Sequence, residues 1–307
     1  MVAQPTAADP SGEVYLPLRR RSYVRPMLRF ATHKPLGAAG ALVLVLLCVL
    51  AVFGSELKPY DENLTVANIL QDPSWSHPFG TDFIGRDLFS RVIVGAKTSF
   101  FIGILVVLIS TGAGLLIGSV SAYWGGTLDL LLQRVVDAFQ AIPLIVFGAA
   151  VVTVLGPGMR FGLPFTIIIA LGIIFTPVNV RVIRASGFGV MAQPYVLASR
   201  STGATHLRLI FRHLIPNLMA PVIVLASVQL GAAVLVEASL AFLGIGVPPP
   251  TPTWGGLLSG ETRTYMQQHP HLAIFPGLAL VIFVMGVNFL GDAIRDVLDP
   301  RLRGGNV

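Results

Sequence analysis

The chain has 307 residues, of which 54% are apolar and only 12% are charged, about half the charged fraction of a soluble domain. With 21 Lys and Arg against 15 Asp and Glu the net charge is +6, which in a soluble protein would suggest nucleic acid as a partner. Long apolar runs exclude that interpretation and indicate a membrane protein. The single cysteine, Cys48, excludes an intrachain disulfide and a cysteine metal site.

Six stretches of the chain are apolar enough to cross a bilayer, which takes roughly 20 residues of helix. We therefore expect an all-α polytopic membrane protein with six transmembrane helices. In chain order the expected spans lie at residues 36–53, 100–123, 137–160, 160–181, 216–243 and 273–290.

Lys and Arg near the span ends predict the orientation, because cytoplasmic loops carry an excess of them. With the N-terminus in the cytoplasm, fifteen such residues fall inside and six outside. Both termini are therefore expected in the cytoplasm. The expected divisions are a basic tail (1–35), the first span with an extracytoplasmic loop (36–96), a core of five spans (97–291) and a C-terminal tail (292–307).

No catalytic pattern is found along the chain. The stretch "VIVGAKTS" resembles a phosphate-binding loop, but Ala96 stands where such a loop needs Gly before Lys97. His206 and His213 are seven residues apart, and His269 and His271 flank a proline, but neither pair has a third ligand in sequence. The sequence therefore predicts no catalytic residue and no metal site.

Glu237 is the one acid well inside an expected span, where a charge costs roughly 2.5–3.5 kcal/mol on insertion scales. Two interpretations stay open. Glu237 faces a translocation pathway and meets a cationic group of a solute, or it pairs with a polar group of a neighbouring helix.

Residues 195–216 form a basic, amphipathic segment between two expected spans. Leu207, Ile210, Phe211 and Leu214 follow helical spacing and predict one apolar face, and Gly203 supplies a turn between two short helices. Such a face can enter a groove of a partner protein or lie on lipid, and periodicity alone favours neither.

The spacing of Ala198, Gly203 and Pro216 resembles the "EAA" loop of permease subunits of ATP-binding-cassette importers. The segment departs from that pattern at four positions. Leu197 replaces the acid, Ser199 the second Ala, His213 the Ile and Ile215 the Leu, which puts in doubt any salt bridge of the missing acid.

Four further blocks resemble the second permease of the dipeptide, oligopeptide and nickel importers. They are residues 77–99 ("HPFGTDFIGRDLFSRVIVGAKTS"), 125–143, 235–258 and 290–304, in the order of that family. In the first block Asp82, Asp87 and Arg86 fit either a loop folded by local ion pairs, which we favour, or direct contact with a binding protein. In the second span Gly112, Gly114 and Gly118 suit close helix packing, within the chain or against a partner permease.

The resemblance implies a type I importer permease in a bacterial inner membrane, with the EAA loop (181–219) as a cytoplasmic coupling helix. Its implied partners are a homologous permease, two ATPase subunits that bind ATP and Mg, an extracytoplasmic solute-binding protein, peptide substrate and the lipid bilayer, with no nucleic acid. This chain itself would bind no cofactor and hydrolyse nothing. The implied coupling residues are Tyr195, Val196, Ala198, Ser199, Arg200, Gly203, Ala204, Leu207, Arg208, Phe211 and Pro216.

Other functions fit the sequence less well. The same architecture with another solute, such as a nickel chelate, glutathione or haem, remains an alternative. A self-sufficient carrier is disfavoured by the scarcity of charge inside the spans. A membrane enzyme is disfavoured because no acid, base and nucleophile converge.

Overall fold

The computed structural model describes residues 32, 34–160 and 163–298. The chain divides into a first unit, residues 1–35, and a second unit, residues 36–307, and the architecture below belongs to the second. The basic N-terminal tail up to residue 31, and the arginines beyond residue 298, lie outside the described residues.

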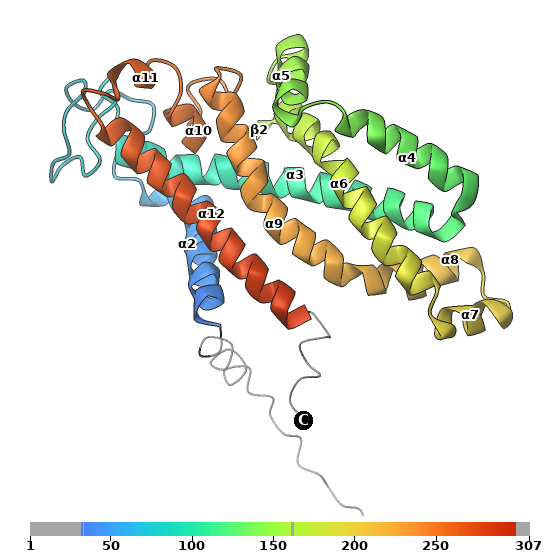
Figure 1. Ribbon diagram of the computed structural model, residues 1–307. Helices are drawn as coiled ribbons and strands as arrows, with labels where there is room; N and C mark the ends of the chain where they lie inside the picture. Colours follow the sequence, from blue (N-terminus) through green and yellow to red (C-terminus); the bar gives the residue numbers. More distant parts are fainter. Residues whose placement is uncertain (1–31, 33, 161–162, 299–307) are drawn as a thin grey trace, which may run out of the picture. The chain divides into compact units, whose positions relative to one another are not determined.

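Five helices of the described residues are long and apolar enough to cross a membrane (Figure 1). They are α2 (Pro35–Leu57), α3 (Leu88–Trp124), α6 (Phe165–Met191), α9 (Ile215–Phe242) and α12 (His271–Leu298). The shorter elements are α4 (Gly126–Gln140), α5 (Leu144–Leu155), β1 (Met159–Arg160), β2 (Leu163–Pro164), α7 (Pro194–Ser201), α8 (His206–Arg208), the π-helix η1 (Leu209–Leu214), α10 (Trp254–Leu257) and α11 (Thr262–Tyr265). The fold is that of a mostly helical membrane protein, as expected.

The third expected span is not one straight helix. Helices α4 and α5 meet at an angle of 81°, so the pair is either a broken span or a re-entrant loop. At 12 residues, α5 is about 18 Å long, well short of a bilayer's hydrocarbon core of about 30 Å. Pro143 explains the break, because it lacks an amide hydrogen and disfavours helical geometry at Ile142.

Several helices are longer than the apolar runs that predicted them. Helix α3 starts at Leu88, twelve residues before the expected boundary, because Asp87 caps it through the Ser90 amide at 2.8 Å. Helix α6 continues to Met191 and α12 to Leu298. The segment joining the fourth and fifth spans is therefore shorter than the expected 181–219.

Helix α3 packs along α6 and α9, and α12 packs on α9. The closest approach uses the glycines of the second span. A Cβ on Gly114 would lie 2.3 Å from the Asn179 Cβ of α6, and one on Gly118 would lie 3.0 Å from Ile183, whereas Gly112 faces open space. The close packing of Gly114 and Gly118 is therefore within the chain, against α6.

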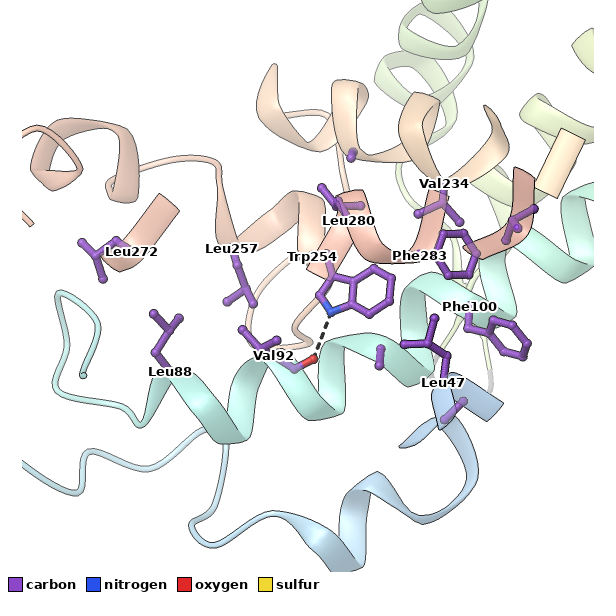
Figure 2. Close-up of a cluster of buried hydrophobic side chains, with 14 residues drawn as sticks. Leu47, Leu88, Val92, Phe100, Val234, Trp254, Leu257, Leu272, Leu280 and Phe283 are labelled. Carbon is purple, nitrogen blue, oxygen red and sulfur yellow. Dashed lines mark hydrogen bonds between the residues drawn. The ribbon is translucent and has the colours of Figure 1, made fainter. Parts of the chain in front are cut away.

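Near the start of α3, Trp254 lies at the centre of a cluster of buried hydrophobic side chains (Figure 2). Its ring lies close to Phe283 of α12, and its Nε1 donates to the carbonyl of Val92 in α3 at 3.0 Å. The Trp254 amide also donates to Ser99 Oγ at 3.1 Å. These contacts fasten the loop between α9 and α12 to α3.

Candidate functional site

The segment 195–216 has a different shape from the two short helices expected. Helix α7 begins with Pro194 and ends before Gly203, whose φ of +84° reverses the chain. Thr205 then caps α8, and the helix runs on through η1 into α9 without a break. The second half of the segment is therefore the first part of a span, so α8, η1 and α9 form one continuous helix, 206–242.

Exposure separates the predicted coupling residues into three groups. Val196 is buried within the chain, so it anchors α7 instead of contacting a partner. Ser199 and Ala204 are half-buried. The remaining predicted residues are exposed: Tyr195, Ala198, Arg200, Gly203, Leu207, Arg208, Phe211 and Pro216.

The apolar face expected from helical spacing is split. Leu207 is 68% exposed and Phe211 62% exposed, whereas Ile210 and Leu214 are buried against the chain itself. The cause is η1, in which the Ile215 amide bonds to the carbonyl of Ile210, five residues back. The wider turn of a π-helix rotates successive side chains away from the 3.6-residue spacing.

Two histidines that the sequence analysis set aside as a metal pair instead hold this segment in place. His213 of η1 contacts α7 through Ser199 Oγ (3.3 Å from Nε2) and through the ring of Tyr195. His206 Nδ1 lies 2.5 Å from the hydroxyl of Tyr123, near the end of α3. Sequence reasoning missed these anchors, since Tyr123 carries no local signal for a partner 83 residues away.

The exposed surface of the segment combines apolar and basic groups. Leu207 and Phe211 stand out from it, and so does Leu197, where the EAA acid is missing. Arg200, Arg208 and Arg212 are exposed as well, and the described residues provide no ion pair for any of them. We call these six residues the apolar-basic patch.

Ion pairs stiffen the helices beside the patch. Arg184 of α6 bonds to both carboxylate oxygens of Asp129 in α4 at 2.5 Å, and Ser121 of α3 donates to the same carboxylate. Arg181 pairs with Asp137 nearby, with both side chains about half exposed. The arginines that the charge count assigned to a loop thus lie on a span and join α4 to α6.

Among the described residues, Glu237 of α9 is fully buried. Its Oε1 accepts a hydrogen bond from Thr253 Oγ1 at 3.1 Å, and its Oε2 has no partner there. This geometry matches the second interpretation, in which Glu237 pairs with a polar group and does not face a translocation pathway. The partner, Thr253, lies in the loop before α10 and not in a neighbouring helix.

At the same end of α9, the loop before α3 is held together by local charge pairs. Asp82 accepts from Arg86 Nε at 2.7 Å and lies 3.7 Å from Arg91. Asp87, which the sequence paired with Arg86, instead contacts His77 Nδ1 at 2.8 Å and caps α3. The expected pair of Asp87 with Arg86 was therefore wrong, because the start of α3 and His77 take up the Asp87 carboxylate.

A cavity of about 370 Å³ lies between this loop and the α9–α12 loop. Asp82, Arg86 and Arg91 line one side, and Thr251 and Glu261 line the other. Helix α9 has 28 residues, so about 42 Å separates its two ends, with the apolar-basic patch at one and this cavity at the other.

Comparisons with known proteins agree on one kind of protein. Residues 114–304 match the family described as "Binding-protein-dependent transport system inner membrane component". The glutathione transport system permease protein GsiD of Escherichia coli O6:K15:H31 is 38% identical over 266 residues, covering 86% of each chain. GsiD of Shigella boydii serotype 4 gives the same figures.

Among solved structures, the inward-facing MetNI methionine ABC transporter is similar, with a TM-score of 0.54 and 17% identity. The match covers 69% of this chain and 98% of that chain. At this identity the likeness shows a shared fold and nothing about the solute.

Proposed function

Since the chain belongs to the inner-membrane permeases of binding-protein-dependent ATP-binding-cassette importers, we propose that it forms half of a pathway for short peptides and is driven through its apolar-basic patch. The patch would seat in a groove of a cytoplasmic ATPase subunit. A homologous permease would supply the other half of the pathway. ATP and Mg²⁺ would be bound by the two ATPase subunits, so this chain would have no enzymatic activity.

The observation that carries the coupling role is the continuity of the helix from His206 to Phe242. Leu207 and Phe211 project from its first turns, outside the buried core. Because a continuous helix transmits displacement along its axis, a partner that moves these side chains also moves α9. A segment that only rested on lipid would need no such connection.

The proposed orientation places the apolar-basic patch and both termini in the cytoplasm. Three arginines between α6 and α9 (Arg200, Arg208 and Arg212) support this side, because cytoplasmic loops are rich in Lys and Arg. The cavity at the opposite end of α9 would then face outward, where a solute-binding protein delivers its cargo. Its acidic and basic lining suits a polar protein surface.

The proposed solute class comes from the relatives and not from a binding pocket. GsiD is a glutathione permease by name, and glutathione is itself a tripeptide. Glutathione as the dedicated solute, a nickel chelate or haem remains the alternative with the same architecture. Uptake of labelled glutathione and of di- and tripeptides by the reconstituted importer tests the peptide class against these alternative solutes.

Coupling is tested by co-expressing the chain with its permease partner and ATPase subunits and measuring ATPase retention on purification. Phe211→Ala removes an exposed aromatic group from the patch and is expected to weaken docking by about 2 kcal/mol, roughly 30-fold. Leu64→Ala, with the same 62% exposure in the outer loop, is the matched control. Equal ATPase retention by the two variants would refute the docking role and favour a helix resting on lipid.

A further inference from the structure

The loop before α3 and the start of α12 bring together three metal-ligand side chains. Asp72, His269 and His271 each offer a ligand atom, and these atoms all lie within 4.8 Å of one another. The sequence discounted the two histidines because no third ligand was near in sequence. That ligand lies almost 200 residues earlier in the chain.

The distances do not fit direct hydrogen bonds. Asp72 Oδ1 is 3.8 Å from His269 Nδ1 and 3.7 Å from His271 Nδ1, beyond the usual limit of about 3.2 Å. Two ligands on one tetrahedral Zn²⁺ ion, each about 2.0–2.1 Å from it, stand about 3.4 Å apart. The two distances from Asp72 are therefore a few tenths of an ångström from the spacing that an ion would impose, and all three ligand atoms lie within 4.8 Å of one another.

Two ring nitrogens in this cluster are left without partners. His269 Nδ1 and His271 Nε2 are buried and accept or donate no hydrogen bond among the described residues. His271 is only 6% exposed. His269 faces Asp72 through its unpartnered Nδ1, whereas His271 faces Asp72 through Nδ1 and its unpartnered Nε2 lies on the other side of the ring. Buried polar atoms are nearly always satisfied, so the unpartnered His269 Nδ1 beside the carboxylate points to a missing ligand.

The backbone around the cluster is well fixed. Gln71, next to Asp72, exchanges bonds with Thr81, whose side chain is fully buried. Phe79 stacks on Phe275 of α12 with ring centroids 3.9 Å apart. The loop is thereby held against the start of α12, so the backbone that carries the three ligands is positioned before any ion arrives.

We propose that Asp72, His269 and His271 form a binding site for one divalent transition-metal ion of the Zn²⁺ class. Two imidazoles and one carboxylate suit Zn²⁺, Co²⁺ or Ni²⁺ better than Ca²⁺ or Mg²⁺, which take oxygen ligands. Asp72 is 83% exposed on its side chain, which gives the ion a path from solvent. Three protein ligands leave a coordination position open to water or to a donor atom of another molecule. This site does not depend on the function proposed above.

The test uses the full-length chain, purified in detergent without a polyhistidine tag. Zn²⁺ is titrated by calorimetry, and Co²⁺ is followed by its visible absorption, which reports coordination directly. We expect one ion per chain, not displaced by millimolar Ca²⁺ or Mg²⁺. His269→Gln and Asp72→Asn should each lower affinity at least tenfold, because even changes beyond the first coordination shell cost about 10–100-fold.

Matched controls replace the same residue types outside the cluster. His206→Gln, at the other end of the protein, and Asp61→Asn, in the same loop, should bind the ion as the unmodified chain does. Both test variants change partly exposed side chains, so they are expected to fold. Binding of no stoichiometric ion by the unmodified chain, or equal affinity in test and control variants, would overturn the proposal.

Discussion

Replacing Thr253 by Val removes one hydroxyl at nearly constant size and tests how Glu237 is held. That hydroxyl donates to Glu237 Oε1 at 3.1 Å and accepts the Gly256 amide at 2.9 Å, as the N-cap of α10. Both bonds are removed by the change. Thr253→Ser keeps both and is the matched control.

The expected loss follows from the two bonds. An N-cap contributes about 1 kcal/mol, and a buried acceptor left without a partner costs about 1–3 kcal/mol. Glu237 would then have neither oxygen bonded, because Oε2 already lacks a partner among the described residues. Thr253→Val should therefore lower the free energy of unfolding by about 2–4 kcal/mol, and Thr253→Ser by less than about 1 kcal/mol.

Unfolding in detergent, followed by Trp fluorescence, measures these differences, and a double-mutant cycle isolates the pair. Replacing both partners by apolar groups is nearly neutral, so Thr253→Val combined with Glu237→Leu should be more stable than the Thr253→Val single variant. Additive losses would refute the pairing. Glu237→Gln keeps an acceptor for Thr253, so uptake should be unchanged, and a raised KM for solute would instead indicate a place in the pathway.

Two other predictions rest on glycines. Gly203 has a φ of +84°, so Gly203→Ala should strain the turn by about 1–2 kcal/mol and lower uptake per ATP hydrolysed, measured in vesicles. Gly189→Ala, in the last turn of α6 and facing open space, should leave that ratio unchanged, and equal ratios in the two variants would contradict the role of the turn. Gly114→Val should separate α3 from α6, because its side chain would overlap Asn179, and should lower the yield of folded protein on gel filtration. Gly112 faces open space, so Gly112→Val should leave the yield of folded protein unchanged. An equal loss of yield in the two variants would contradict the packing of Gly114 against α6.

The positions of the spans were predictable because the bilayer demands long apolar runs whatever the tertiary structure. Hydropathy could not show where a helix stops once it leaves the apolar region. Asp87 extends α3 outward by capping it, and Pro143 breaks the third run within its apolar length. Both are local chemical effects that an average over 18 or more residues hides.

Whether a candidate site could be predicted depended likewise on how far apart its residues lie in the sequence. The Asp82–Arg86 pair was predictable, since its residues are four apart. The split apolar face was not, because helical spacing assumes 3.6 residues per turn and η1 departs from it. The cluster of Asp72 with His269 and His271 exists only because the loop before α3 folds against the start of α12.

Helix α9 is the element that joins both ends of the protein. Its start continues from the apolar-basic patch, and near its other end Glu237 bonds to Thr253, one residue before Trp254. Trp254 in turn donates to Val92 in α3. A displacement of α9 along its axis must therefore either stretch the Glu237–Thr253 bond or carry the α9–α12 loop and α3 with it. Because that bond and the Trp254 contacts are buried, moving the loop as a body is the less costly outcome. Movement at the patch would then reach the cavity lined by that loop, about 42 Å away, without any mobile charge inside the spans.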